Sequence, residues 1–437
     1  MRRNNIIFAG FMLFSLFFGA GNLIFPPLLG LESGSNFGPA IAGFLITGVL
    51  LPFMAIMAVA LSDGGLVSMG NQVHKVFGMV FAIIIYMSIG AFYGIPRASN
   101  VAYELGYKQM FHIDSWLTLV IFSLIFFSIT YYISLNPKKI VDRIGQVLTP
   151  FLLLVLTMLV IQAFIKFDNN SSPAKGKYAS SPFVNGFLEG YFTMDAVAAL
   201  AFGIVVINAL KDKGAKSKTE LVKGTFGAAL LAGLGLTIVY FSLGWIGRFI
   251  PADKDFKNGA EILAVAANIL FASGGGLLFG LIVILACLTT CVGLINACSR
   301  FFNGIFPKIT YQSYVAIFVL VGLLVSNLGL NSILKLATPL LVFIYPISIV
   351  LVMLSLFQHF GGGSKMMYRL SVFVTSIYAL YQVLTSLGYK LDILTQWLGV
   401  APFFEQGLGW VIPGFVAALA GYGIDKFRVG SSQTNLR

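Results

Sequence analysis

The first apolar run, from Ile6 to Leu29, is interrupted in its middle, and this interruption constrains the fold more than any other feature. The run is long enough to cross a bilayer as a helix of about 20 residues. Its centre contains Gly19, Gly21 and Asn22, followed by two prolines, and these residues disfavour one unbroken helix. In a membrane, freed backbone groups are tolerated only where they are buried in protein or line a wet cavity. The sequence therefore predicts a broken helix at a binding site, in preference to a simple packing kink.

The composition places the chain in a membrane. Of the 437 residues, 58% are hydrophobic and 10% are charged, and the mean hydropathy is +0.91. Such values are typical of integral membrane proteins. The formal net charge of +12 comes from short loops between apolar runs and not from one basic stripe, so nucleic-acid binding is not expected. We predict an all-α integral membrane protein within a lipid bilayer.

The apolar runs predict twelve transmembrane helices. They begin near Ile6, Pro39, Val76, Ser115, Ile144, Phe183, Gly224, Gly276, Thr310, Ser332, Met367 and Gln406. A further run, residues 260–272, is too short to cross and precedes three glycines, which suggests a re-entrant segment on the outer face. Basic residues collect in alternate loops, most densely from Lys211 to Lys223, and this bias predicts that both termini are cytoplasmic.

Two pairs of spans share local patterns. Thr149-Pro150 in span five resembles Thr338-Pro339 in span ten, and a polar interruption in span six matches the break in span one. This pairing predicts a five-plus-five inverted repeat, with residues 1–165 as the first repeat and 166–357 as the second. Residues 358–437 would add two helices and a cytoplasmic tail. Interrupted helices at corresponding positions of two repeats indicate the binding site.

Few charged residues lie inside the predicted spans. Glu189 and Asp195 flank the interruption of span six, where a carboxylate is costly unless it is paired or hydrated. Their functional interpretation is cation coupling or amine recognition; the alternative is a carboxylate in a wet vestibule or at a helix cap. Arg97 and Glu104, at the end of span three, suggest an ion pair in an outer gate. An arginine that reaches the membrane interface is the alternative.

Span eight contains a set of oxygen atoms suited to a small cation. Ala286, Thr289 and Thr290 share one face by their i, i+3, i+4 spacing, which offers a carbonyl and two hydroxyls. Hydroxyls that bond only to their own helix are the alternative for the threonines.

The run from Gly10 to Pro27 resembles the signature of the bacterial branched-chain amino acid:cation symporter family, and Ile95–Arg97 and Glu189–Asp195 are similar to that family as well. The resemblance implies a LeuT-type fold with broken helices one and six. The sequence contains no His-Glu-x-x-His, Gly-x-Ser-x-Gly or Gly-x-x-x-x-Gly-Lys-Ser/Thr motif, so no enzymatic activity is expected. The resemblance further implies import of leucine, isoleucine and valine across the bacterial cytoplasmic membrane with Na⁺, or alternatively H⁺, and no organic cofactor. A LeuT-type carrier of another small neutral solute is the alternative. One departure is Gly90–Gly94, where the family pattern would have Gly-Pro-Phe.

The resemblance also implies where the ligands bind. Na⁺ would lie between the span-one break and span eight, held by atoms of Ser15, Phe18, Ala286, Thr289 and Thr290. The substrate carboxylate would meet free backbone N–H groups at the start of a half-helix, and the ammonium would meet carbonyls at the span-six break. The predicted substrate-binding set is Gly19, Ala20, Gly21, Asn22, Glu189, Gly190, Tyr191 and Thr193. Asp195, Arg97 and Glu104 are the predicted coupling or gating residues.

Overall fold

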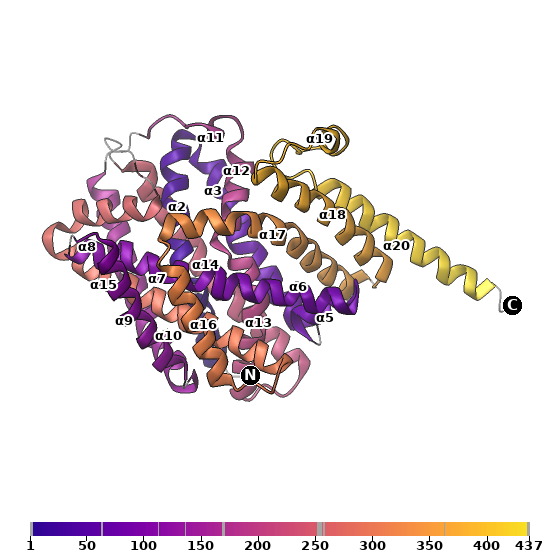
Figure 1. Ribbon diagram of the computed structural model, residues 1–437, viewed down its shortest axis with the longest axis horizontal. Coiled ribbons are helices and arrows are strands. Elements are labelled where there is room, and N and C mark those ends of the chain that lie inside the picture. The colour runs from indigo at the N-terminus through magenta and orange to yellow at the C-terminus, as the bar shows by residue number, and fades with distance from the viewer. Residues whose placement is uncertain are drawn as a thin grey trace. The chain divides into compact units, whose positions relative to one another are not determined.

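The computed structural model describes residues 3–62, 64–111, 113–135, 137–167, 171–250, 256, 258–361 and 363–434. The described part is helical throughout and contains no strand (Figure 1), as predicted. It divides into two compact units, one of Met1–Phe53 and Tyr86–Leu334 and the other of Met54–Ile85 and Lys335–Arg437. The predicted boundaries of the two repeats stay a prediction. They concern internal symmetry, whereas these two units are defined only by how compactly the chain packs.

The first part of the chain alternates α-helices with short 3₁₀ and π segments. In order, these are α1 (Arg3–Phe17), α2 (Ala20–Ser33), η1 (Gly34–Asn36), α3 (Phe37–Leu45), η2 (Ile46–Leu50), α4 (Leu51–Leu61), α5 (Gly65–Asn71), α6 (Lys75–Met87), η3 (Ser88–Phe92), α7 (Gly94–Val101), η4 (Ala102–Tyr107) and α8 (Lys108–Phe111). The segments η2, η3 and η4 are π-helical. Such segments are frequent at functional sites because they rotate the side chains that follow.

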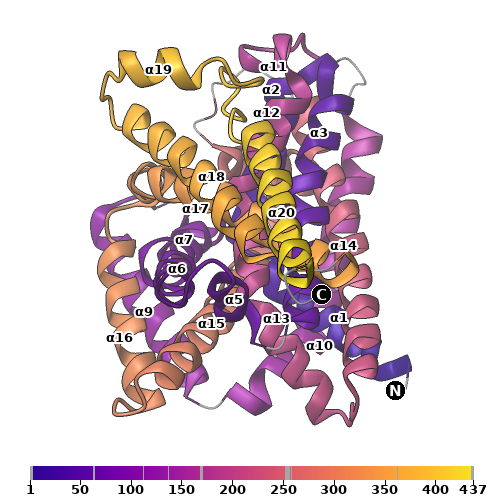
Figure 2. The ribbon, with the colours of Figure 1, turned by 90° about the vertical axis from the view of Figure 1, so that its right-hand side faces the viewer.

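The remainder of the chain contains longer helices. They are α9 (Trp116–Ser134), α10 (Pro137–Lys166), α11 (Lys177–Ser180), α12 (Pro182–Glu189), the 3₁₀ segment η5 (Gly190–Thr193), α13 (Asp195–Asp212), α14 (Lys218–Phe249), α15 (Gly259–Ile305), α16 (Tyr311–Ser326), α17 (Leu330–Gly361), α18 (Lys365–Ser386), α19 (Asp392–Leu398) and α20 (Val411–Thr434). In the first unit, α9 and α16 run side by side (Figure 2). In the second unit, α18 and α20 pack along one another, and the Ser371 hydroxyl donates to the Gly414 carbonyl at 2.8 Å.

The two predicted helix breaks are confirmed. α1 ends at Phe17 and α2 begins at Ala20, and between them Gly19 is extended, with φ −136° and ψ −156°. The second break follows η5, where Met194 has φ 69° and ψ 6° in the left-handed region. That conformation costs a non-glycine residue on the order of 1–2 kcal/mol, so the surrounding structure must hold it in place. The segments on either side of Met194 differ in direction by 43°.

Fewer single helices can cross a membrane than the twelve predicted spans. In the described part, six helices are long and apolar enough, or seven if the bent pair around Met194 counts as one span. The number of such helices is smaller than the number of predicted spans because several spans are divided or short. For example, α1 has 15 residues and α16 has 16. The last span begins at Val411, five residues after the predicted Gln406.

The short run before span eight does not form a helix of its own, because α15 continues through residues 260–272 and the three glycines to Ile305. Gly259–Leu270 is too short to cross a membrane, as predicted, and the stretch long enough to cross begins at Phe279. A re-entrant position on the outer face stays a prediction.

Helix α15 nevertheless turns sharply at the three glycines. A Cβ added to Gly276 would lie 3.0 Å from Asn268 Oδ1, whereas eight residues of straight helix rise about 12 Å. The glycines thus produce a bend within one helix and not the end of a helix.

Close contact between α2 and α14 depends on glycine. A Cβ added to Gly247 would lie 1.9 Å from the Pro27 carbonyl oxygen, which is backbone and cannot rotate away. Small residues allow helices in a membrane to approach this closely. This contact fixes α14 against the half-helix that follows the first break.

Replacing Gly247 with alanine should therefore destabilise the protein, by about 1–3 kcal/mol as for other overpacked sites. The matched control is Gly38→Ala, since an added Cβ at Gly38 has nothing within 4 Å. Thermal denaturation followed by size-exclusion chromatography in detergent would compare the two variants. Equal melting temperatures for both variants would contradict the close α2–α14 contact.

Candidate functional site

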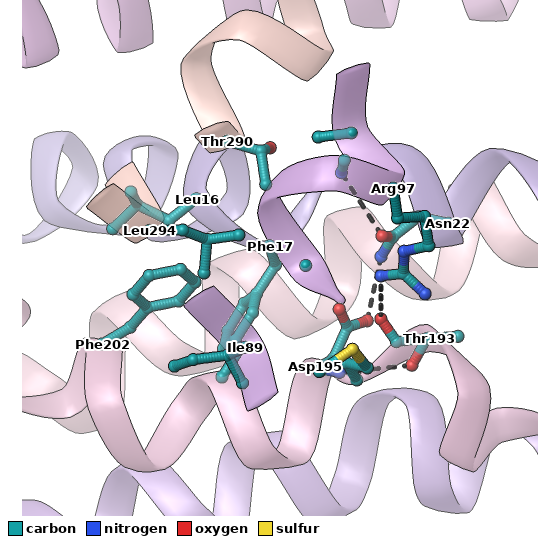
Figure 3. Close-up of a pocket in the computed structure, with 15 residues that line it drawn as sticks. Leu16, Phe17, Asn22, Ile89, Arg97, Thr193, Asp195, Phe202, Thr290 and Leu294 are labelled. Atoms are coloured by element: carbon teal, nitrogen blue, oxygen red, sulfur yellow. Dashed lines mark hydrogen bonds between the residues drawn. The ribbon is translucent and has the colours of Figure 1, made fainter. Parts of the chain in front are cut away.

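A cavity in the first unit lies where the two breaks meet α7 and α15. It is lined by Leu16, Phe17, Gly19, Asn22, Ile89, Gly94, Arg97, Ala98, Thr193, Met194, Asp195, Ala198, Phe202, Thr290 and Leu294. Figure 3 shows Asn22, Thr193 and Asp195 close to Arg97, whereas the labelled apolar side chains lie on the other side of the pocket, with Thr290 above them. The cavity thus has a polar part and an apolar part.

Asn22 and Asp195 join the two breaks directly. Asn22 Nδ2 donates to Asp195 Oδ2 at 2.9 Å, and the Tyr240 hydroxyl donates to the same oxygen. The side chain of Asn22 also bonds to Tyr240, and its Oδ1 accepts the Gly19 backbone N–H at 3.3 Å. Asp195 is 3% exposed and begins α13, where the positive end of the helix dipole favours an anion. A buried carboxylate is thereby held in the first unit, where the two breaks meet.

Arg97 approaches the same point from α7. Its Nη1 donates to the Tyr93 hydroxyl at 3.0 Å and to the Phe192 carbonyl at 2.6 Å, and its Nη2 donates to the Thr193 carbonyl at 3.0 Å. The 3₁₀ turn η5 ends at these two residues, so their carbonyls are free to accept. The arginine is 5% exposed. A guanidinium is thus buried within the break of span six.

The predicted pair between Arg97 and Glu104 is wrong. Glu104 Oε2 pairs instead with Lys108 Nζ at 3.2 Å, and that amine also pairs with Asp114 at 2.7 Å. Lys108 is four residues from Glu104 on the same face, whereas the π segment η4 disturbs the seven-residue alignment with Arg97. Arg97 therefore belongs to the cavity, and Glu104 belongs to a separate cluster of charges.

The predicted cation site is brought together in part. Thr290 Oγ1 donates to the Phe18 carbonyl at 3.3 Å, which connects α15 to the first break. The Thr289 hydroxyl donates to the Ala286 carbonyl of its own helix at 2.7 Å. Ser15 is half-buried on α1, and within the described residues no hydrogen bond joins it to either threonine. Of the two threonines, Thr290 is the one that hydrogen-bonds to the first break.

Of the predicted substrate set, Gly19, Asn22 and Thr193 line the cavity, whereas Gly21, Glu189, Gly190 and Tyr191 are not among its described lining residues. The side chain of Ala20 lies outside the part of the chain that the structure describes. Glu189 Oε2 pairs with Lys177 Nζ at 3.1 Å. Gly190 packs on α3 and η2, where an added Cβ would lie 2.0 Å from Thr47 Oγ1. The ring of Tyr191 contacts Phe187, with 5.6 Å between centroids. Thus the end of η5 presents the carbonyls of Phe192 and Thr193 to Arg97, while Glu189, Gly190 and Tyr191 contact other elements.

Sequence reasoning missed the two tyrosines of the site. Tyr240 lies within the apolar α14, and a phenol buried in a membrane helix usually has a hydrogen-bond partner. Tyr93 precedes Arg97 by four residues, a spacing that places them on one helical face. The sequence thus shows a phenol within the apolar α14 and a tyrosine four residues before Arg97. It does not show which group either tyrosine hydroxyl binds.

The chain is similar to known transport proteins along nearly its whole length. Residues 2–428 match the family described as branched-chain amino acid transport protein. The chain is 41% identical to the branched-chain amino acid permease BrnQ of Bacillus subtilis, covering 98% of both chains. It is 38% identical to the permease BraB of the same organism, covering 98% of this chain and 97% of the other. These relatives are permeases and not enzymes.

Solved structures with the same fold are also transporters. The structure of Mhp1, a nucleobase-cation-symport-1 family transporter with bromovinylhydantoin bound, superposes with a TM-score of 0.62 at 14% identity, over 98% of this chain and 93% of that one. A manganese transporter of Eremococcus coleocola superposes with a TM-score of 0.57 at 13% identity, over 96% of each chain. At these identities the likeness establishes the LeuT-type fold alone, and it confirms the predicted fold class.

Proposed function

The chain belongs to the family of branched-chain amino acid transport proteins, and from this premise we propose that it imports leucine, isoleucine and valine by symport with a cation, Na⁺ in preference to H⁺. It is a transporter with a LeuT-type fold and not an enzyme. The observation that supports the substrate class is the division of the cavity into a polar and an apolar part. A branched-chain amino acid has the same division between its charged backbone and its aliphatic side chain.

The apolar part of the cavity suits the substrate side chain. Leu16, Phe202 and Leu294 contribute only hydrocarbon there, so they offer no polar partner to a charged side chain. In the polar part, the substrate ammonium would face the carboxylate of Asp195. A methylene group in an apolar pocket is worth only about 1–3 kcal/mol of discrimination. Leucine, isoleucine and valine should therefore all be transported and should compete with one another.

The coupling cation would be held between the first break and α15. The Phe18 carbonyl and the Thr290 hydroxyl already lie next to each other, and Thr289 and the Ala286 carbonyl lie on the adjoining turn. Hard oxygen atoms of this kind suit Na⁺. Proton coupling through Asp195 is the second candidate, since this carboxylate is buried inside the cavity.

We place the transporter in the bacterial cytoplasmic membrane, with both termini in the cytoplasm. The basic loop from Lys211 to Lys223 supports this orientation. Single cysteines introduced into that loop should react with a membrane-impermeant thiol reagent only after the membrane is permeabilised. Labelling of intact cells would overturn the orientation.

Labelled-leucine uptake into proteoliposomes, with Na⁺ and pH gradients imposed separately, tests the proposed function. We expect an inward Na⁺ gradient to drive accumulation of leucine and a pH gradient alone to drive little. Accumulation that depends on the pH gradient alone would assign coupling to protons. Absence of leucine uptake under both gradients would favour another small neutral solute as the substrate.

Competition between amino acids for uptake tests whether the pocket for the substrate side chain is apolar. Excess isoleucine and valine should each inhibit leucine uptake strongly, whereas lysine and glutamate should inhibit it little because a charged side chain would be desolvated without a partner. Inhibition constants measured in the same proteoliposomes give the comparison. Strong inhibition by lysine would contradict the branched-chain assignment.

A further inference from the structure

We propose that Arg97 is the residue that binds the substrate carboxylate, an inference that rests on the proposed function of amino acid transport. The sequence predicts backbone N–H groups at Gly19, Ala20 and Gly21 for this role. The Gly19 N–H, however, already donates to Asn22 Oδ1 at 3.3 Å. The start of α2 therefore offers fewer free donors than expected, and the guanidinium beside it becomes the principal anion-binding group.

Arg97 is a buried cation with no carboxylate in direct contact, although Asp195 lies in the same cavity. Within the described residues, no Asp or Glu oxygen lies within 4.0 Å of its nitrogen atoms, and its three hydrogen bonds go to neutral oxygens. Its Nε is buried and has no hydrogen-bond partner. Burying a charge without a counter-charge is unfavourable. A bound carboxylate would provide the acceptor that Nε lacks and a negative charge in direct contact with the guanidinium.

The surroundings of the guanidinium increase the local positive potential. The guanidinium lies against Gly21 near the first turn of α2, and an added Cβ at Gly21 would lie 2.8 Å from Arg97 Nη2. The N-terminus of a helix carries a partial positive charge, which repels a cation and attracts an anion. Two positive groups therefore converge on one cavity, an arrangement that an anion would stabilise.

The neighbouring carboxylate does not take this place. Asp195 Oδ2 receives its hydrogen bonds from Asn22 and Tyr240, so Asp195 is held beside Arg97 and not paired with it. Figure 3 shows Arg97 and Asp195 together in the polar part of the cavity. A substrate with one carboxylate and one ammonium matches this separated pair of charges. Arginine suits the carboxylate because its planar fork can donate two parallel hydrogen bonds.

The test compares leucine with leucinamide, which keeps the ammonium and the isobutyl group but lacks the carboxylate. Both compounds would compete with labelled-leucine counterflow at pH 6.5, below the usual α-amino pKa of about 7.7–8.0. In the wild type we expect leucine to inhibit at an approximately 100-fold lower concentration than leucinamide, because a site built for a charged group rejects the analogue that lacks it. In Arg97→Gln this preference should fall below about 10-fold, with Arg97→Lys between the two.

A purely structural role of Arg97 would weaken leucine and leucinamide equally, so an unchanged preference in Arg97→Gln would overturn the proposal. The matched control is Arg369→Gln, which removes an exposed arginine whose Nε bonds to the Val73 carbonyl. If the Arg97 variants do not fold, the Gly21→Ala variant tests the proposal instead. Its added Cβ would displace the Arg97 guanidinium without removing the positive charge. An unchanged preference in folded Gly21→Ala would also overturn the proposal. Absence of leucine counterflow in the wild type would instead refute the proposed function.

Discussion

Replacing Asp195 with asparagine is expected to lower leucine uptake by two to three orders of magnitude. The substitution keeps the shape of the side chain but removes the charge that Asn22 and Tyr240 hold in place. It also leaves Arg97 without a neighbouring anion in a buried site. Removing one partner from a set of buried charges typically costs about 3–5 kcal/mol, which corresponds to roughly this loss in rate or affinity. Initial rates of labelled-leucine uptake into proteoliposomes would measure it.

Two further variants separate charge from packing at Asp195. Tyr240→Phe removes one hydrogen bond to Asp195 and keeps the ring, which is edge-on to Phe44 with centroids 5.3 Å apart. We expect it to lower uptake less than Asp195→Asn does, because the carboxylate is retained. The control is Asp392→Asn, which makes the same aspartate-to-asparagine replacement at an exposed position of α19. Uptake by Asp195→Asn at the level of this control would show that the carboxylate has no role in transport.

Replacing Thr290 with valine should raise the Na⁺ concentration required for half-maximal uptake by at least about tenfold. Valine has the shape of threonine without the hydroxyl, and a lost hydrogen bond or ligand to a charged species costs about 1.5–3 kcal/mol. The Thr290 hydroxyl contacts the Phe18 carbonyl, so its loss removes an oxygen from the junction between α15 and the first break. Apparent leucine affinity at saturating Na⁺ should change less. Uptake measured over a range of Na⁺ concentrations would resolve both quantities.

The adjacent Thr289 provides an internal comparison. Its hydroxyl bonds to the Ala286 carbonyl of its own helix, so Thr289→Val should shift the Na⁺ dependence less than Thr290→Val. Thr290→Ser, which restores the hydroxyl, should recover most of the wild-type behaviour. If both valine variants keep the wild-type Na⁺ dependence, the cation does not bind at α15, and coupling would be reassigned to Asp195 and protons.

The broken helices could be predicted because their causes are local. Glycine weakens a helix wherever it occurs, and Gly19 accordingly lies in an extended stretch between α1 and α2, whereas Pro26 and Pro27 lie inside α2 and do not end it. The three glycines at positions 274–276 were equally visible in the sequence, but they bend α15 without ending it. The positions of glycines therefore predict where a helix bends or breaks. Whether the helix ends there depends on the elements that pack around it.

The partners inside the site could not be predicted, because they depend on distant or unusual backbone geometry. Arg97 turns toward carbonyls at Phe192 and Thr193, which no sequence spacing relates to it. Met194 adopts a left-handed conformation that its residue type does not favour. This conformation follows η5 and separates Glu189 from Asp195, so only the second carboxylate reaches the cavity.

The contacts of Asn22 have a consequence for how the protein is made. Its amide donates to Asp195, 173 residues later, and to Tyr240, 218 residues later. Because a chain is synthesised from its N-terminus, Asn22 enters the membrane long before either partner exists. A polar amide in a lipid environment without partners is unfavourable, so the first helices must await α13 and α14 within a sheltered environment. Both hydrogen bonds of Asn22 can therefore form only after α14 has been synthesised.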